Sequence, residues 1–234
     1  MGATSRSPRL RLISSESLDE AASGVVSPSG PVEAIAPDET SGVDEAEAQA
    51  EEDRLLVGRA LRSEARAFES LYRRHAEFAF NLAVRIQGSA SDVEDVVHDA
   101  FLKAHERLDD LRDSAAFRPW LGSIVVRLVR TRLRRRKLLG ALGLTAPEPV
   151  EIDSIAAVDA DPEARAQLAQ VYALLQTLAA DDRIAWTLRY VERHRLETVA
   201  VMMDCSLATA KRRIARTQRF LTEHFVAPFT QSSS

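Results

Sequence analysis

Basic side chains are concentrated on one segment that the sequence predicts to be a helix, residues 118–137. Seven of the eleven residues from 127 to 137 are Arg or Lys and none is acidic, and Arg127, Arg130 and Arg134 share one face. Like charges four residues apart on a helix repel one another. Because a polyanion relieves that repulsion, we expect this face to bind nucleic-acid phosphates. A basic solubilising face is the alternative.

A second basic surface is predicted near the C-terminus, where short helices at 196–203 and 206–222 are joined by a tight turn. Ser206 is the expected N-cap of the second of these helices, and no acid occurs from Cys205 through Thr222. An apolar inner face and a basic outer face on the second helix are typical of a helix-turn-helix. The segment therefore predicts binding to duplex DNA, although purely structural helix pairs share the pattern.

Acidic residues dominate the predicted helix that precedes the first basic one. Asp92, Glu94 and Asp95 fall in its first turn, where carboxylates stabilise the helix dipole, but Asp99 has no such structural role. An acidic and partly apolar face repels DNA. We therefore interpret it as a surface for a basic protein partner.

Catalytic and metal chemistry is not predicted. The sequence contains no glycine-rich phosphate loop, no paired cysteine motif and no nucleophile elbow. Asp95 and His98 have the spacing of half a helical-bundle metal site, but we find no second half. We therefore predict no catalytic residue, no metal and no cofactor, and we interpret Cys205 as a small buried apolar residue.

The elements that must position these surfaces are helices. Only 9 Gly and 9 Pro among 234 residues, with 6% aromatic residues, argue against an all-β fold. Apolar residues recur at spacings of three and four over 61–82, and the acidic helix is expected to begin at a capping box of Ser91 and Glu94. Pro119 falls in the first turn of the basic helix, where it is tolerated. The predicted fold is all-α.

Charge and composition divide the chain into segments. Residues 1–53 carry three basic and twelve acidic side chains, a net charge of −9, whereas residues 54–234 carry 28 basic and 23 acidic ones, a net charge of +5. We expect two small helical domains on a flexible linker. The predicted boundaries are an acidic disordered tail over 1–53, a helical domain over 54–140, a linker over 141–162, a helix-turn-helix domain over 163–224 and a C-terminal tail over 225–234.

The cellular compartment is predicted from what the sequence lacks. No apolar run approaches the roughly 20 residues of a membrane span, and no apolar signal core follows the N-terminus. A single cysteine cannot form an internal disulfide, which fits a reducing compartment. We expect a cytoplasmic chain without membrane insertion.

The order of these segments resembles a known family. Region two of bacterial sigma factors is similar to FESLYRRHAEFAFNLAVRI, SDVEDVVHDAFLKAHERL and FRPWLGSIVVRLVRTRLRRRK. Their region four is similar to LQTLAADDRIAWTLRYVERHRLETVAVMMDCSLATAKRRIARTQRFL. Because the connector between these regions is short, the chain resembles the extracytoplasmic-function (ECF) group over residues 64–222.

The resemblance implies a sigma factor, a subunit that binds core RNA polymerase, recognises promoter DNA and helps to melt it, while the polymerase does the chemistry. The acidic helix would dock on the clamp helices of the β′ subunit through Asp92, Glu94, Asp95, His98, Asp99 and Phe101. The minus-ten element would be bound by Arg112, Asp113, Ser114, Arg118, Trp120, Arg127, Arg130 and Arg134. The minus-thirty-five element would be read by Ser206, Leu207, Ala208, Thr209, Lys211, Arg212, Arg213 and Arg216. An anti-sigma protein is a further implied partner.

Some positions depart from the family pattern. His98 stands where the family usually has Gln, and Asp204 stands at a turn that usually holds Gly. Asp tolerates the left-handed backbone expected there better than most residues do. Ala210 and Arg212 replace common residues of the recognition helix, so the resemblance does not imply a promoter sequence.

Two other classes of protein remain as alternatives at this point. A stand-alone helix-turn-helix regulator with dimerising N-terminal helices would explain the C-terminal segment, but it leaves the basic run and the acidic helix without a purpose. A helical-bundle metalloenzyme would need clustered ligands that the sequence does not supply.

Overall fold

The computed structural model describes residues 39–144, 149–155 and 161–225. Every regular element in these ranges is helical, which confirms the predicted all-α class. The chain divides into two compact units between Ala46 and Glu47, and the surfaces described below belong to the second unit, Glu47–Ser234. None of the helices in the described ranges is long and apolar enough to cross a membrane.

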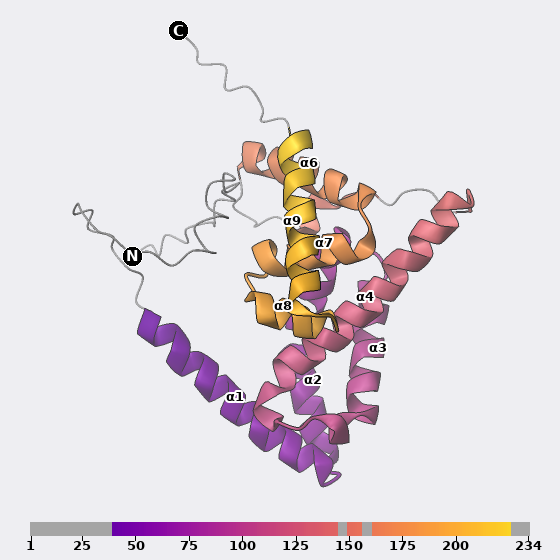
Figure 1. Cartoon of the computed structure of the whole chain (residues 1–234). Coiled ribbons are helices and arrows are strands. Elements are labelled where there is room, and N and C mark those ends of the chain that lie inside the picture. The colour runs from indigo at the N-terminus through magenta and orange to yellow at the C-terminus, as the bar shows by residue number, and fades with distance from the viewer. Residues whose placement is uncertain (1–38, 145–148, 156–160, 226–234) are drawn as a thin grey trace, which may run out of the picture. The chain divides into compact units, whose positions relative to one another are not determined.

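The helices appear in chain order in Figure 1. They are α1 (Glu39–Leu61), α2 (Ala65–Gln87), α3 (Val93–Glu106), α4 (Phe117–Ala141), α5 (Ile152–Ile155), α6 (Pro162–Thr177), α7 (Ala180–Trp186), α8 (Leu196–Met202) and α9 (Leu207–His224). Single 3-10 turns, η3 (Leu108–Asp110) and η4 (Ser114–Ala116), connect α3 to α4, and a π-helical turn, η5 (Thr187–Val191), follows α7. The long basic helix predicted over 118–137 is therefore α4, and the predicted helix-turn-helix pair is α8 and α9.

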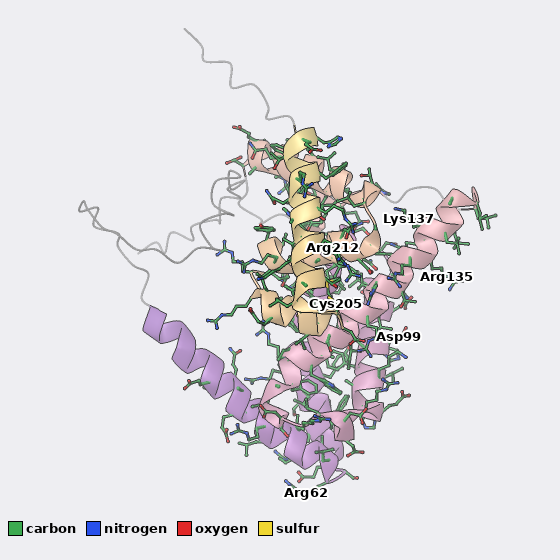
Figure 2. The ribbon with its side chains drawn as sticks, in the orientation of Figure 1. Arg62, Asp99, Arg135, Lys137, Cys205 and Arg212 are labelled. Atoms are coloured by element: carbon green, nitrogen blue, oxygen red, sulfur yellow. The ribbon has the colours of Figure 1, made fainter. Side chains whose placement is uncertain are left out.

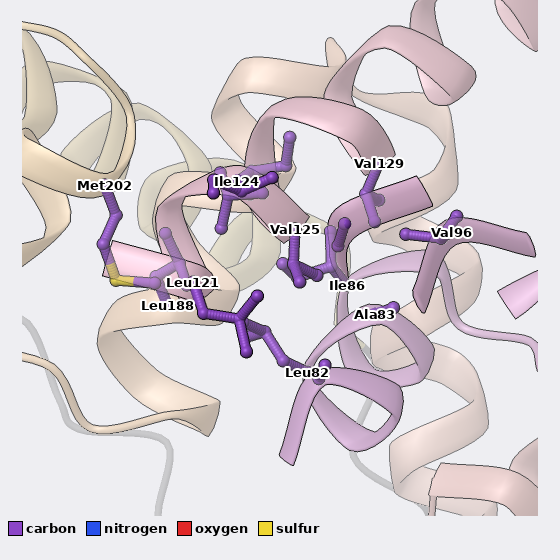
Figure 3. Packing of buried hydrophobic residues seen from close by; sticks show 14 of the residues in the cluster. Leu82, Ala83, Ile86, Val96, Leu121, Ile124, Val125, Val129, Leu188 and Met202 are labelled. Carbon is purple, nitrogen blue, oxygen red and sulfur yellow. The ribbon is translucent and has the colours of Figure 1, made fainter. Parts of the chain in front are cut away.

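Helices α2, α3 and α4 form a bundle because each has one apolar face. Leu82 and Ile86 of α2, Val93 of α3, and Leu121 and Val125 of α4 are completely buried against one another. Figure 3 shows this packing around α4. The apolar periodicity seen in the sequence thus fixes which side of α4 faces inward, and its arginines are left on the other sides.

The second half of α1 is part of this bundle, which differs from the predicted tail over 1–53. Asp53 is 2% exposed, and one of its oxygens lies 2.8 Å from Nε2 of His75 and 3.1 Å from Nε of Arg74. Val57, one turn further along α1, is fully buried. A charged residue can be buried when it is paired in this way, and that pairing could not be inferred from the acidic composition. Residues 1–38 of the predicted tail lie outside the described residues.

The predicted capping box at the start of α3 is wrong. The N-cap is Asp92, not Ser91, and it has a left-handed backbone with φ of 54° and no side-chain capping bond. The main-chain carbonyl of Ser91 instead accepts a hydrogen bond from Nε2 of Gln87, at 3.0 Å. The tight turn after α2 thus positions Ser91 before the helix begins.

The described part of the predicted linker is attached to the first bundle. The main-chain N–H of Glu151 donates to the carbonyl of Gly88 at 2.9 Å, and the Glu151 side chain accepts from the N–H of Ala90 at 2.8 Å. These two bonds satisfy polar groups in the turn between α2 and α3. Residues 149–155 therefore form an ordered connection, whereas the rest of the predicted linker includes ranges that are not described.

Helices α6 to α9 form the second half of the unit. Trp186 of α7 is 2% exposed, and its indole N–H donates to Oε1 of Gln218 on α9 at 2.8 Å. Asp204 has φ of 50°, which confirms the left-handed turn expected between α8 and α9. The hydroxyl of Ser206 accepts from the N–H of Thr209 at 3.2 Å, which confirms the predicted N-cap of α9.

The two halves share one hydrophobic core. Met202 of α8 and Leu188 of η5 are buried in the same cluster as Leu121, and Figure 3 shows their side chains directed toward it. Gly122 makes this contact possible, because a Cβ atom there would lie 3.0 Å from the terminal methyl of Met202. α4 thus supplies core residues to both halves.

Gly88 permits a second close contact between the halves. It has φ of +74°, and a Cβ atom there would lie 3.0 Å from both Tyr172 and Arg183. The hydroxyl of Tyr172 donates to the carbonyl of Arg85 at 2.7 Å, beside an ion pair of Arg85 with Glu192. The turn after α2 is therefore a packing surface for the second half as well as the end of a helix.

We expect Gly88→Ala to destabilise the chain. A left-handed backbone costs a non-glycine residue roughly 1–2 kcal/mol, which corresponds to a fall in Tm of about 2–8 °C for a chain of this size, and the contact with Tyr172 adds to it. Thermal unfolding measures the change. Gly58→Ala is the control, because its Cβ would meet nothing closer than Arg62 at 3.8 Å and Ala favours a helix interior. Equal melting temperatures for the two variants would contradict the role of Gly88.

Candidate promoter and polymerase interfaces

The basic stripe predicted on α4 is present, but its members differ in their surroundings. Arg127 is exposed, the side chain of Arg134 is 59% exposed, and that of Arg130 is only 22% exposed. Figure 2 shows Arg135 and Lys137 further along the same helix. Helix periodicity brings Arg130 and Arg134 to the side of α4 that faces α7.

Asp181 of α7 lies between these arginines. Arg130 donates to both of its carboxylate oxygens, at 2.8 and 3.1 Å. Arg134 donates to them at 3.0 and 2.9 Å, and Arg213 of α9 donates at 2.6 Å. Repulsion between Arg130 and Arg134 is therefore partly relieved within the chain, because a carboxylate from the second half supplies an opposite charge.

The ionisation of this cluster follows from its contacts. Partial burial by itself would raise the pKa of Asp181, but the hydrogen bond from Arg130 and the charges of Arg130, Arg213 and Arg134 lower that pKa below its usual value. The same hydrogen bond raises the pKa of Arg130. Both shifts favour the charged forms, so the contact between Asp181 and Arg130 is an ion pair at neutral pH.

Two other arginines of α4 contact the start of the acidic helix α3. Arg136 donates to the carboxylate of Asp92 at 3.1 Å, and Arg132 lies 3.7 Å from that of Asp95 and also donates to the carbonyl of Asp92. The side chains of Asp92 and Asp95 remain 58% and 74% exposed, so each retains free carboxylate surface. The acidic and basic helices therefore touch at one edge, and the outer face of α3 stays acidic.

The outer face of α3 contains five of the six residues predicted to contact polymerase. These exposed residues are Asp92, Glu94, Asp95, His98 and Asp99; Asp99 is marked in Figure 2. Phe101 is corrected: it is 3% exposed, with its ring 4.6 Å from that of Tyr72 and 6.4 Å from that of Phe68. Phe101 therefore supports α3 from the core and does not present a contact surface.

The turn predicted to capture the minus-ten element precedes α4. Arg112 and Asp113 are exposed, Ser114 is half-buried, and Asp113 accepts the N–H of Ala115 at 3.0 Å, which fixes the turn. Arg118 is exposed and lies 4.4 Å above the ring of Phe78.

The two aromatic residues at the start of α4 differ in burial. Phe117 is fully buried, and its ring lies 6.0 Å from that of Trp120. Trp120 is half-buried and packs against the core on one side. Trp120 therefore retains an exposed part, and the exposed Arg118 lies in the same first turn of α4, so the start of this helix offers both an aromatic surface and a positive charge.

Helix α9 presents most of its predicted reading residues to solvent. Ser206, Leu207, Ala208, Lys211, Arg212 and Arg216 are exposed, and Thr209 is half-buried. Arg216 pairs with the carboxylate of Asp182, and that hydrogen bond raises the Arg216 pKa. Arg213 is the exception, because its side chain is only 17% exposed and is held by Asp181. Asp181 was not among the predicted site residues. A carboxylate in the first turn of a helix already has a structural explanation, and nothing near it in the sequence indicates which distant arginines it contacts.

Comparison with known proteins identifies the family. The family model for sigma-70 region 2 matches residues 71–138, and the one for sigma-70 region 4 matches residues 168–221. The ECF RNA polymerase sigma-E factor of Escherichia coli is 32% identical over 171 residues, which cover 70% of this chain and 89% of that protein. The chain belongs to the ECF sigma factors.

Other relatives of this sigma factor agree. The RNA polymerase sigma-H factor of Pseudomonas aeruginosa is 32% identical over 173 residues, which cover 71% of this chain and 90% of that protein. The solved structure of CnrH in complex with the cytosolic domain of CnrY has a TM-score of 0.50 and 27% identity, and the similarity covers 74% of this chain and 96% of CnrH. The sigma factor directs promoter-specific transcription by RNA polymerase and is an initiation factor, not an enzyme. The stand-alone regulator is not favoured.

Proposed function

We propose that this sigma factor divides its work among three surfaces. The acidic face of α3 would dock on the β′ clamp helices of core polymerase, the turn before α4 and the α4 stripe would hold the minus-ten region, and α9 would read the minus-thirty-five element. The observation that carries the proposal is the separation of charge: α3 exposes carboxylates, whereas α4 and α9 expose arginines and lysines. Like charge repels DNA from the first surface, and opposite charge attracts it to the other two.

DNA melting would begin at the turn before α4. Flipping a base out of a duplex costs a few kcal/mol, so a surface that binds an extruded base shifts the duplex toward opening. Trp120 offers part of an aromatic ring, and Arg118 places a positive charge beside it. Stacking on the ring would hold the base, while phosphate contacts along the α4 stripe would keep the adjoining duplex in register.

Location, domains and partners complete the proposal. A polymerase subunit works where the chromosome is, so we place the chain in the cytoplasm. The region-two and region-four domains would be those predicted, except that the first also includes α1 from residue 47, of which Asp53 and Val57 are buried. An anti-sigma protein is the further partner, supported by CnrH, which was solved in complex with the cytosolic domain of another protein.

Asp95→Arg is expected to abolish binding to core polymerase. Asp95 is 74% exposed on the side chain, so the change reverses the charge of the docking face and leaves the core intact. Co-purification with core enzyme and run-off transcription measure the effect, and circular dichroism checks the fold. Asp110→Arg makes the same change on η3, outside the docking face, and should bind normally. Binding retained by Asp95→Arg would remove α3 from the polymerase interface.

Arg130→Ala, assayed in the holoenzyme, is expected to weaken promoter binding by a similar factor on different promoters. A phosphate contact carries no base preference, and its loss should lower the slope of log affinity against log salt by about one. Filter binding or fluorescence anisotropy across a salt series measures that slope. Arg66→Ala, an exposed arginine of α2, is the matched control. A slope equal to that of the control would exclude Arg130 from the phosphate contacts.

Arg212→Ala is expected to relax specificity rather than only to weaken binding. Arg212 is exposed on α9 (Figure 2), and an arginine that reads a base edge contributes about 1–3 kcal/mol of discrimination at that position. Transcription from a library randomised over the minus-thirty-five element should therefore show one position losing its preference. Arg219→Ala, near the far end of the same helix, should leave every preference unchanged. Identical profiles for both variants would show that Arg212 reads no base.

A further inference from the structure

One carboxylate in this sigma factor is shared by three arginines from two helices. Asp181 accepts hydrogen bonds from Arg130 and Arg134 of α4 and from Arg213 of α9, at distances of 2.6 to 3.1 Å. The Asp181 side chain is 12% exposed, and those of Arg130 and Arg213 are 22% and 17% exposed, whereas that of Arg134 remains 59% exposed. Charge-assisted bonds of this kind are among the stronger ones in proteins.

The three arginines come from the two surfaces assigned above to DNA. Arg130 and Arg134 belong to the stripe on α4 that would hold phosphates near the minus-ten element, and Arg213 belongs to the helix that would read the minus-thirty-five element. Guanidinium groups bind carboxylates and phosphates with the same paired geometry. A carboxylate at this position therefore occupies the donors that a DNA phosphate would use.

We propose that Asp181 is an intramolecular substitute for a DNA phosphate, which holds the free sigma factor closed with its two DNA-binding halves joined. The proposal rests on the assignment of α4 and α9 to promoter DNA. In the closed form one carboxylate occupies donors of three arginines and offsets part of their positive charge, and the second half lies on α4. Promoter binding requires Asp181 to give up these partners, so the free chain binds DNA less tightly than its basic surfaces allow.

Neighbouring contacts depend on the same arrangement. Arg130 also donates to the carbonyl of Met203 at 3.3 Å, and Lys137 donates to that of Leu178 at 3.3 Å, so α4 is bonded to main-chain groups on both sides of α7. Elsewhere along α4, Met202 of the second half packs into the hydrophobic core that the two halves share. Release of Asp181 would therefore remove one edge of the interface and shift the equilibrium toward separated halves, which only the apolar edge still opposes.

A phosphate can approach the cluster without prior unfolding. A cleft of about 530 Å³ lies beside Asp181, and its charged lining consists of Arg134, Lys137, Arg213 and Arg216 with the carboxylates of Asp181 and Asp182. Four cations against two carboxylates leave this lining net positive, so it attracts an anion, which can then compete with Asp181 for the guanidinium groups. The cleft gives a route for exchange of one anion for the other.

The closed form is not a pH switch in the neutral range. The pKa of Asp181 lies below its unfolded value, so its stabilisation is complete above the unfolded value of about 3.9. It is lost only as the pH falls through the lower folded value. The partner that opens the chain must therefore act by competition for the arginines or by binding the separated halves.

The decisive variant is Asp181→Asn in the full chain without polymerase. We expect its affinity for a promoter duplex at low salt to rise on the order of tenfold, and the salt slope to steepen by about 0.9 for each arginine released. Small-angle scattering should show a larger radius of gyration. Asp204→Asn is the matched control, because it removes the same charge from an exposed position beside α9 without breaking an arginine hydrogen bond. Equal affinities and slopes for the two variants would overturn the proposal.

A second measurement covers the case in which Asp181→Asn fails to fold. Inorganic polyphosphate added to the wild-type chain should compete with Asp181 and increase the radius of gyration, and an unchanged radius at saturation would overturn the proposal. The measurements distinguish a failure of the closed form from a failure of the DNA assignment. If Arg130→Ala still lowers the salt slope in the holoenzyme while Asp181→Asn behaves like its control, the DNA assignment stands and only the closed form is rejected.

Discussion

The constraint on which the whole unit depends is that one helix, α4, must pack against both halves. Leu121 and Val125 are buried in the shared core, and Gly122 lies beside Met202 of the second half. The buried residues of α4 end at Val129, and no residue of this helix beyond Val129 is buried. Its basic run therefore lies mostly on the part of α4 that extends past the core, where the arginines stand close to one another on the edges of the helix and to the elements packed alongside.

Confinement of like charges on those edges explains the ion pairs that surround α4. Residues four apart on a helix share a side, so Arg130 and Arg134 meet one neighbour and Arg132 and Arg136 meet another. The first pair is partly neutralised by Asp181 and the second is drawn to the start of α3. The spacing that would cause repulsion on an isolated helix thus directs one pair of arginines to Asp181 and the other pair to Asp92 and Asp95.

Predictions from the sequence are correct where the local structure is determined by neighbouring residues. The turn between α8 and α9 was predictable because Asp204 tolerates a left-handed backbone and Ser206 caps the helix that follows. The alternation of charged and apolar residues likewise predicted the exposed carboxylates of α3. These features depend on neighbours within one or two turns of the chain, and no distant contact changes them.

Predictions from the sequence are wrong where burial depends on residues far along the chain. Asp53 belongs by composition to an acidic tail, but His75 and Arg74 draw it into the core. Phe101 matches a contact position by alignment, but the rings of Phe68 and Tyr72 enclose it. For Asp53 a partner far along the chain decides between exposure and burial, and composition alone does not indicate it. For Phe101 the apolar spacing along α3 already favours burial, and only the role implied by the resemblance is wrong.

The division of the α4 arginines also bears on how the sigma factor first meets DNA. In the closed form Arg127 is exposed and forms no ion pair with the described residues, so it can contact phosphate without any rearrangement. Arg130 and Arg134, one and two turns further along, become available only when Asp181 is displaced. Contact would therefore begin near the end of α4 that follows the minus-ten turn. A phosphate bound there holds the neighbouring phosphates of the same DNA close to α4, which raises their local concentration. Those phosphates would then compete with Asp181, first for Arg130 and then for Arg134.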